Sequence, residues 1–339
     1  MRVEVAKLIE DRAISHAKDL AKNIHLREIE RKPDTRHGFM RGLEYYGGAY
    51  LIRVLSNSIL NFFLARKRFP RHPLRCETLG EKIFWSKFIV PLPLPTPANR
   101  LIVGEFIPPG MCDKIRVSKV VWESNRADLP ADLRAPPGGY YLKSNHAWKT
   151  ARRIALPYSA TDRAELAEMG RNWLGRKAHN FNSGEWWYST ISPKLYIEEE
   201  IVNELDEAME FNFYTIEGKV VVLIRKKLTN YADGLVNPTS EYISIYGDGF
   251  RHMVDASYKN SLNPATPAPL DIELMYEAAG AIGSPFEFAR IDLYNPSPGV
   301  VYLGEITLCP TAGNGYFSPQ KYEYDLGSAW DLGKYVRPQ

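Results

Sequence analysis

The sequence predicts an α+β protein with a helical N-terminal extension, and three observations support this prediction. Apolar residues recur at helical spacing in residues 1–32 and 47–68, near the start of the chain. Beyond them, apolar runs bounded by turn residues predict strands and hairpins, with further helices between them. The 339 residues are enough for about two or three subdomains with a large core.

The composition argues against several protein classes. Charged residues make up 24% of the chain and the net charge is only +3, so no strong field marks a nucleic-acid-binding protein. The charged N-terminal residues do not resemble a signal peptide, and no run approaches the roughly 18–20 apolar residues of a membrane span. Isolated cysteines (Cys76, Cys112 and Cys309) are typical of reduced thiols in a cytoplasmic protein, not of disulfides or a zinc site.

The N-terminal extension, residues 1–73, is expected to hold two helices. Residues 1–32 carry a loose apolar stripe that includes Leu8, and the helix within residues 47–68 runs into a basic cluster. One interpretation is an interfacial helix with a basic anchor, giving residues 47–75 weak contact with the inner face of a membrane. The alternative is a helix packed on the main domain, which is the usual role of an apolar stripe.

Residues 74–138 form a region that precedes the expected binding core. Residues 78–87 predict a short helix, because Thr78 provides an N-cap and Glu81 stands at the capping-box position. A proline-rich connector follows, and the next apolar runs, 101–107 and 115–121, suit buried elements.

Residues 139–203 are expected to form a small subdomain. The stretch GYYLKSNHAWKT (139–150) predicts a strand that ends at Lys143, a polar loop and a second strand near residues 152–156. A lysine at the end of a strand can hold a phosphate as a point charge. The alternative is a surface hairpin with an exposed lysine, which is common.

The same region ends in an acidic strand. After a helix at residues 162–177, the strand LYIEEEI carries three consecutive acids. Alternation along a strand places Glu199 on one face and both Glu198 and Glu200 on the other. At least one of these acids is therefore expected to point inward or to line a cleft.

Residues 204–339 are expected to form a large subdomain with a metal site. The predicted elements are a hairpin at 212–225 turning at Glu217–Gly218, an irregular segment at 228–269 with short strands such as 242–246, a helix at 270–281, the hairpin 286–310 and an aromatic, loop-like tail.

The hairpin 286–310 carries the main candidate site. Side chains two apart on a strand share a face, so Arg290 projects with Asp292, and Glu305 projects with Thr307 on the partner strand. If the two faces coincide, a cation and two carboxylates converge, and such carboxylates suit Mg²⁺ with water and phosphate as further ligands. The alternative is an ordinary hairpin with outward polar residues and Arg290 as a cross-strand partner.

Taken in order, these stretches resemble the TupA-like family of the ATP-grasp superfamily, which is associated with teichuronopeptide biosynthesis. The resemblance runs from about residue 74 to residue 330 and rests on TLGEKIFWSK, YYLKSNH, EWWYSTISPKLYIEEEI, FNFYTIEGK, ARIDLY and YLGEITLCPTAG. It implies an ATP-grasp fold, in which two α+β subdomains grip ATP in the cleft between them.

The resemblance also implies roles for individual residues. Phosphate contacts fall to Lys143, to the loop 144–149 with Ser144, His146 and Lys149, and to Arg100; adenine contacts fall to Glu198, Glu199 and Ile201, and the ribose contact to Glu210. Mg²⁺ ligands would be Asp292, Glu305 and Thr307, and the catalytic residues would be Arg290 and Lys143.

Three departures from the family pattern stand out. The phosphate-binding loop reads His146–Ala147–Trp148 where small flexible residues are usual. An upstream Asp-Lys pair is Asn99–Arg100, followed by Gly104 in place of an arginine, and an Asp-Tyr-Lys-Phe pattern is 210–213, Glu-Phe-Asn-Phe. We expect the nucleotide chemistry to be retained and the acceptor pocket to be altered.

The implied function is an ATP- and Mg²⁺-dependent carboxylate–amine ligase that forms an amide through an acyl-phosphate. Its substrates would be a carboxylate and an amine on a cell-surface polysaccharide precursor or a small peptide-like metabolite. The alternatives are a phosphotransferase on the same fold, a degenerate nucleotide-binding protein, and a glycosidase that uses Asp292 and Glu305 as acid and base. The sequence does not predict the oligomeric state.

Overall fold

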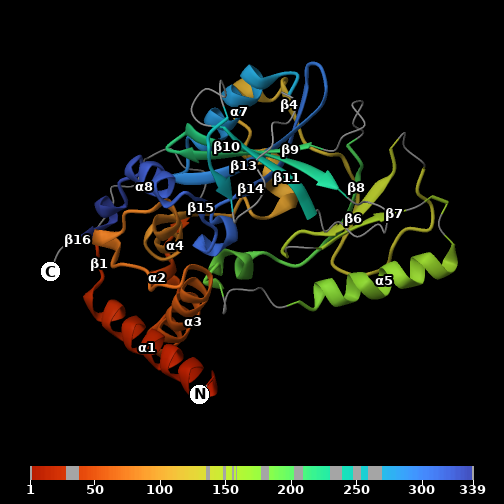
Figure 1. Ribbon diagram of the computed structural model, residues 1–339. Coiled ribbons are helices and arrows are strands. Elements are labelled where there is room, and N and C mark those ends of the chain that lie inside the picture. Colours follow the sequence, from red (N-terminus) through yellow and green to blue (C-terminus); the bar gives the residue numbers. More distant parts are fainter. Residues whose placement is uncertain are drawn as a thin grey trace.

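The computed structural model describes residues 2–27, 38–134, 138–147, 150–154, 156–157, 159–176, 183–201, 209–229, 239–246, 253–258 and 269–337. The chain forms a main body and a smaller lobe, and the N-terminal helix projects from the body on the side away from that lobe (Figure 1).

The helices of the described residues are α1 (Arg2–Asn23), α2 (Gly42–Tyr45), α3 (Gly48–Arg66), α4 (Leu79–Ile89), α5 (Ala160–Leu174), α7 (Ile272–Gly283) and α8 (Gln320–Ser328). The short 3₁₀ helices are η1 (Pro73–Arg75), η2 (Arg100–Phe106), η3 (Pro109–Met111), η4 (Trp186–Thr190), η6 (Pro310–Gly313) and η7 (Leu332–Tyr335).

The strands of the described residues are β1 (His25–Leu26), β2 (Gly38–Met40), β3 (Leu92–Leu94), β4 (Ile115–Arg116), β5 (Val120–Ser124), β6 (Tyr140–Ser144), β7 (Ala151–Ile154), β8 (Leu195–Glu199), β9 (Met209–Ile216), β10 (Lys219–Thr229), β11 (Thr239–Tyr246), β12 (Ser257–Tyr258), β13 (Phe288–Ser297), β14 (Val300–Thr307), β15 (Phe317–Ser318) and β16 (Val336–Arg337).

The large sheet of the main body has, within the described residues, the strand order β11-β10-β9-β13-β14-β4. Its strands are antiparallel except for the short β14–β4 pair. Both predicted hairpins are confirmed: β9 and β10 turn at Glu217–Gly218, where both residues have positive φ, and β13 and β14 turn at Gly299, which also has positive φ. Glycine is favoured at such positions because it lacks a Cβ atom.

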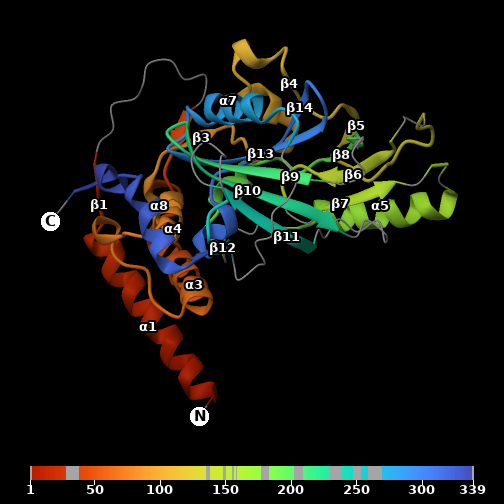
Figure 2. The ribbon, with the colours of Figure 1, turned by 45° about the horizontal axis from the view of Figure 1, so that its top comes forward.

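The two faces of the large sheet have different coverings. Helix α7 packs along one face (Figure 2), where Phe213 contacts Tyr276 edge to face. On the opposite face, the C-terminal tail covers one end of β9 and β13, because Phe288 stacks on Trp330 and Tyr214 contacts Phe317. The other end of that face is polar and carries the residues of the candidate site.

The small sheet forms the smaller lobe, with the strand order β5-β8-β6-β7 within the described residues. Helix α5 lies against one face of it, and both form a separate hydrophobic core in which Trp173 and Leu166 of the helix pack with Leu142 and Ile197. Figure 1 shows α5 running along this sheet at the far end of the molecule. The opposite face of the small sheet carries Lys143.

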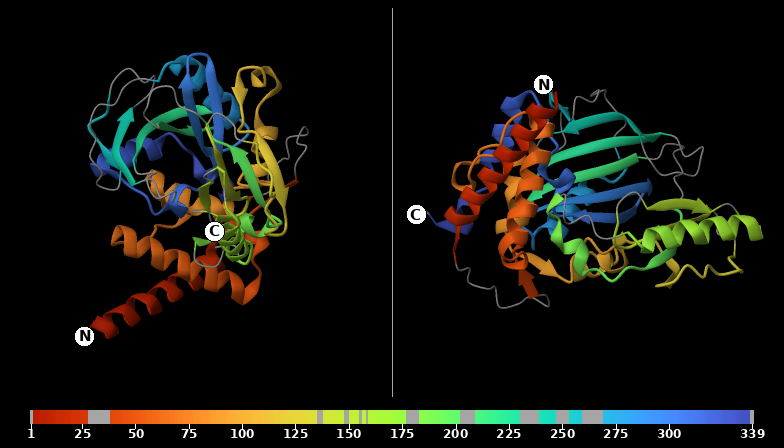
Figure 3. Two further views of the ribbon diagram at one scale, coloured as in Figure 1. Left: turned by 90° about the vertical axis from the view of Figure 1, so that its right-hand side faces the viewer. Right: turned by 90° about the horizontal axis from the view of Figure 1, so that it is seen from below.

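The N-terminal helices share a hydrophobic core with the large sheet. Helices α1 and α3 lie side by side (Figure 3), and Val54, Ile59 and Phe62 of α3 belong to the core that also contains the strands of the main body. Among the described residues, α3 is the helix whose length and composition would allow it to cross a membrane, and 33% of that apolar window is buried inside the structure. This burial favours the packed helix over the interfacial one.

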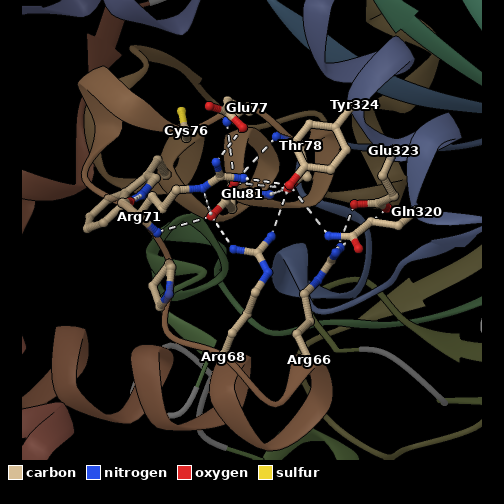
Figure 4. A network of polar contacts seen from close by, with 12 residues as sticks. Arg66, Arg68, Arg71, Cys76, Glu77, Thr78, Glu81, Gln320, Glu323 and Tyr324 are labelled. Carbon is tan, nitrogen blue, oxygen red and sulfur yellow. Dashed lines mark hydrogen bonds and ion pairs between the residues drawn. The ribbon is translucent and has the colours of Figure 1, made fainter.

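The basic cluster after α3 pairs with acids of the chain itself (Figure 4). The Arg66 guanidinium bonds to Glu323 of α8 at 2.8 Å. Arg68 and Arg71 both bond to Glu81 of α4, whose side chain is fully buried. These arginines therefore hold α3, α4 and α8 together, and contact of residues 47–75 with a membrane stays a prediction.

Two sequence expectations differ from the structure. The loop-like tail contains a helix, α8, which begins after Pro319 and is held by tertiary contacts such as the buried Glu323–Arg66 pair. Leu8, expected on the buried stripe of the first helix, is 68% exposed, whereas Ala13 and Leu20 are buried as expected. Both errors arise because packing against distant residues decides the outcome.

The capping box of α4 is confirmed and also anchors the arginine cluster. Thr78 accepts a hydrogen bond from the Glu81 amide, and the Glu81 carboxylate accepts one from the Thr78 amide. Hydrogen bonds from Arg68 and Arg71 lower the pKa of Glu81 to about 2, against the opposing effect of burial, which is the largest single influence.

We expect Glu81→Gln to destabilise the protein by about 3–5 kcal/mol, because it leaves two arginines facing a neutral group in a buried network. The ionised form of Glu81 stabilises the fold above its ordinary pKa, and this contribution is lost as the pH falls from 4.5 toward about 2. Urea unfolding at several pH values measures both effects. The control Glu77→Gln, at a side chain 59% exposed, should have little effect; equal losses would contradict the assignment.

Candidate active site

The candidate site lies at the polar end of the large sheet, where the register of β13 and β14 brings the predicted residues together. Arg290 pairs with Thr307 across the two strands, and Asp292 pairs with Glu305. The Arg290 guanidinium donates two hydrogen bonds to the Asp292 carboxylate, at 2.7 and 2.6 Å. The predicted convergence of Arg290, Asp292, Glu305 and Thr307 is therefore present in the structure.

The row of carboxylates continues onto β9. The fully buried Asn212 donates from Nδ2 to Asp292 at 2.7 Å and to Glu210 at 2.5 Å. Lys226 of β10 lies opposite Glu210 and donates to it at 3.2 Å, and Tyr294 donates to the same carboxylate at 3.4 Å. We call Glu210, Asp292 and Glu305 the acidic row, since they follow one another across three neighbouring strands.

Arg100 connects the acidic row to the smaller lobe. Its guanidinium lies 3.4 Å from Glu305, and it donates to the backbone carbonyls of Ser144 and Ala147 at 3.5 and 3.4 Å. Glu305 also accepts a hydrogen bond from Thr307 at 3.0 Å. A single half-buried arginine therefore contacts both the candidate metal site and the loop expected to hold phosphates.

Lys143 lies on the open face of the small sheet. It forms an ion pair with Glu198 of β8 and its ammonium lies 5.4 Å from the centre of the Tyr141 ring. The predicted alternation of the acidic strand is confirmed, because Glu200 joins the same face through Arg153 at 2.9 Å, while Glu199 pairs with Lys119 at 3.0 Å. Ile201 follows the strand and is half-buried.

The loop after β6 is well anchored over the residues that the structure describes. Ser144 is buried and its hydroxyl lies 2.8 Å from that of Thr150. Asn145 donates to the carbonyl of Ser192 at 3.1 Å, and Nε2 of the buried His146 lies 3.3 Å from the carbonyl oxygen of Arg176. The remaining predicted residues of this loop, Trp148 and Lys149, lie outside the described residues.

Two carboxylates of the acidic row have shifted pKa values of opposite sign. Burial raises the pKa of Asp292 to about 7, with Glu210 and Glu305 raising it further and Arg290 opposing them. For Glu210, the attraction of Lys226 and Arg290 outweighs burial and lowers the pKa to about 2. A cation placed beside Asp292 would relieve the repulsion that raises its pKa.

The donor set fits a magnesium ion that takes its other ligands from phosphate and water. Asp292 and Glu305 are paired carboxylates, and hard oxygen ligands of this kind suit Mg²⁺. The amide oxygen of Asn212 is buried beside Asp292 and has no hydrogen-bond partner in the described part of the chain. Within that part no group of three His, Cys, Asp or Glu residues forms a complete cage, and Mg²⁺ bound with a nucleotide does not need one.

Sequence reasoning missed several residues of this region. Asn212 and Lys226 complete the acidic row, and strand alternation from Glu210 with the hairpin turn at 217–218 could have identified both. Tyr188 and Glu185, in the segment before β8, lie within electrostatic range of Glu305. No local pattern predicts their position, because a long loop brings them to the large sheet.

Comparison with family models gives a match to the TupA-like ATP-grasp family over residues 158–330. The match spans just over half of the chain. The chain belongs to the TupA-like ATP-grasp family. The predicted resemblance and the ATP-grasp fold class are thereby confirmed, and the expected enzyme class, an ATP-grasp ligase, is confirmed at the level of the family. The matched range includes the acidic row, while Arg100 and Lys143 precede it.

Solved structures with a similar arrangement include an L-amino acid ligase from Bacillus licheniformis, with 14% identity and a TM-score of 0.37 over 62% of this chain and 42% of that one. A D-alanine–D-alanine ligase from Bacillus anthracis, complexed with ATP, has 13% identity and a TM-score of 0.37 over 68% of this chain and 63% of that one. The macrocyclase MdnC from Microcystis aeruginosa, bound with its precursor peptide, has 10% identity and a TM-score of 0.28 over 63% and 57%.

This chain spans between about two fifths and two thirds of the length of these solved chains. Comparison with curated proteins gives no match.

We expect Asn212→Leu to lower the free energy of unfolding by about 1–3 kcal/mol, because it removes the donor that two half-buried or buried carboxylates share. Leucine has nearly the volume of asparagine, so a cavity contributes little to the change. Thermal and urea unfolding measure the loss. The control Asn23→Leu removes a surface bond to Asp19, 2.9 Å long, and should be nearly neutral; an Asn212 variant as stable as the control would show that the shared bond is unimportant.

Proposed function

We propose that this chain is a cytoplasmic ATP- and Mg²⁺-dependent carboxylate–amine ligase. One observation carries the proposal: a conserved-in-chemistry set of a bidentate arginine and two paired carboxylates, Arg290 with Asp292 and Glu305, stands at the open end of the large sheet of an ATP-grasp family member. Arg100 links that set to the loop after β6, on which phosphates would bind.

Three parts of the chain would bind the nucleotide. Lys143 and Arg100 would contact its phosphates, and both cations are paired with acids, Glu198 and Glu305, so a phosphate would compete with those carboxylates. The strand β8 with Glu198, Glu199 and Ile201 would contact the adenine. Glu210 would contact the ribose, although its bonds to Lys226 and Asn212 tie it to the acidic row.

Asp292, Glu305 and Thr307 would hold the magnesium ion. When bound, the ion would supply charge neutralisation at the phosphate oxygens. The bidentate hydrogen bonds of Arg290 keep Asp292 oriented toward Glu305, and Asn212 fixes its other side. The chain therefore supplies preorganised charges, which lower the barrier without reorganisation during the reaction.

The reaction would proceed in two steps. An oxygen of the substrate carboxylate attacks the γ-phosphorus of ATP, the bond to the β-phosphate oxygen breaks, and ADP leaves. The nitrogen of the amine then attacks the acyl carbon, phosphate leaves, and the nitrogen loses its extra proton. Arg290, beside Asp292, is placed to neutralise the developing negative charge at the acyl-phosphate and its tetrahedral successor.

The substrates we propose are a carboxylate and an amine on a cell-surface polysaccharide precursor or a small peptide-like metabolite. The name of the family supports the first, and the amino-acid and peptide ligases among the similar structures are in keeping with the second. A phosphotransferase would use the same nucleotide site but would release ADP with a hydroxyl acceptor alone, so product analysis separates the two.

We expect ATP with Mg²⁺ to raise the free energy of unfolding by about 2.7 kcal/mol at a hundredfold excess over Kd. Lys143→Met should remove most of this gain, because it deletes a phosphate-binding charge. Thermal shift assays measure it. The control Lys114→Met alters a surface pair with Glu277 and should keep the full gain. A melting temperature that does not respond to nucleotide at any Mg²⁺ concentration would refute the proposal.

We expect Asp292→Asn and Glu305→Gln each to reduce turnover by at least a hundredfold while the melting temperature stays near that of the wild type. Each change keeps the shape of the side chain and removes a metal-binding charge. ADP release in the presence of a pooled acid and amine panel measures turnover, and circular dichroism checks the fold. A folded variant that retains most of its activity would show that the carboxylate has a structural role only.

A further inference from the structure

The carboxylates around the acidic row differ in one respect, namely whether a cation neutralises them. Glu210 pairs with Lys226 at 3.2 Å, Asp292 with Arg290 at 2.6 Å and Glu305 with Arg100 at 3.4 Å. For Glu185, no Lys or Arg of the described residues lies within the 4 Å of an ion pair. Its carboxylate is half-buried. An unpaired acid in such a place is costly unless a further partner completes it.

The backbone around Glu185 is held rigidly. Gly184 has a φ of +76°, and a Cβ atom there would lie 2.8 Å from the Phe88 ring. Trp186 is fully buried and donates its indole N–H to the carbonyl of Lys87 at 3.0 Å. Glycine on one side and an anchored tryptophan on the other therefore fix the point from which the Glu185 side chain starts.

A buried lysine ties this segment to the loop that follows β14. The Lys87 ammonium donates to the carbonyl of Ser183 at 2.5 Å and to that of Ala312 at 3.0 Å. Ala312 lies in η6, where Thr311 and Ala312 both have a φ near +54°, a conformation that non-glycine residues rarely adopt. Lys87 thereby links the Glu185 segment to a strained loop only a few residues beyond Glu305.

Glu185 also lies within electrostatic range of the acidic row itself. Glu305 and Lys87 both influence the Glu185 carboxylate, and Glu185 and Glu305 together influence Tyr188. Burial is the largest of these effects and raises the pKa of Glu185, as expected of an acid that lacks a cation. The position is thus beside the metal-binding carboxylates, on the side of the 310–313 loop.

We propose that Glu185 binds the ammonium group of the amine substrate and orients it toward the acyl carbon. This inference rests on the proposed ligase function. The cations Arg100 and Arg290 would bind the phosphate and carboxylate groups of the reaction, whereas the amine arrives as a cation and needs a carboxylate without one. Among the described residues beside Glu305, Glu185 meets that requirement.

The competing explanation is a structural acid, with Ser183 as its hydrogen-bond partner. The two explanations differ in which nucleophiles should depend on Glu185. Hydroxylamine traps acyl-phosphates as hydroxamates and is largely uncharged at neutral pH, so it does not need an ammonium site. An amino acid or an alkylamine does need one.

The experiment compares wild type, Glu185→Gln and Glu185→Asp with ATP and Mg²⁺. Each of the twenty common amino acids serves as the acid, with hydroxylamine as nucleophile in one arm and a second amino acid as the amine in the other. Hydroxamate and ADP are measured. The matched control is Glu287→Gln, which removes a half-buried acid that pairs with Lys334 at 2.8 Å away from the acidic row.

We expect Glu185→Gln to raise the KM for the amine by about tenfold to a hundredfold, as for a lost charge-assisted hydrogen bond, with hydroxamate formation changed less than about twofold. Glu185→Asp keeps the charge and should lie between wild type and the Gln variant. The thermal shift with ATP and Mg²⁺ should be the same in all three, which also shows that each protein is folded.

Two results would overturn the inference while the ligase function stands: Glu185→Gln reduces both arms equally, or it changes neither arm. A wild-type protein that forms no hydroxamate with any acid would instead overturn the ligase function, and the role of Glu185 would fall with it. The two failures are therefore distinguishable in a single set of measurements.

Discussion

The polar half of the large sheet depends on the pairing of each buried charge with an opposite charge on a neighbouring strand. Arg290 neutralises Asp292, and Lys226 neutralises Glu210, while Asn212 donates to both carboxylates from between them. A buried carboxylate without such partners would cost several kcal/mol. Because the pairs alternate in sign across β10, β9 and β13, the face stays close to neutral, and the row of acids can exist without disrupting the sheet.

The same pairing sets the terms on which a ligand can bind. A phosphate approaching Arg100 competes with Glu305, and one approaching Lys143 competes with Glu198. A divalent cation at Asp292 and Glu305 would take over part of the neutralisation that the arginines provide. Nucleotide and metal are therefore expected to bind together, since each relieves the charges that the other leaves unpaired. Arg100 extends this coupling to the smaller lobe through its bonds to the loop after β6.

Local patterns were enough to predict the parts of the site that lie on hairpins. Strand alternation and turn residues determine that Arg290, Asp292, Glu305 and Thr307 share one face, and the structure has them in register. The same rules could have predicted Asn212 and Lys226. They could not predict Glu185, because a loop between α5 and β8 carries it to the large sheet, nor the helix α8, which depends on the distant Arg66. Positions set by packing between remote segments leave no periodic signal in the sequence.

The small pairing of β1 with β16 has a consequence for how the molecule forms during synthesis. His25 and Leu26 pair with Arg337 and Val336, and Arg27 donates to the carbonyl of Val336 at 2.9 Å. The N-terminal helices emerge from the ribosome first, yet their last partners are among the final residues to be made. These helices must wait for more than 300 residues of translation before their packing is complete. The segment that is synthesised earliest is thus among the last to reach its native surroundings.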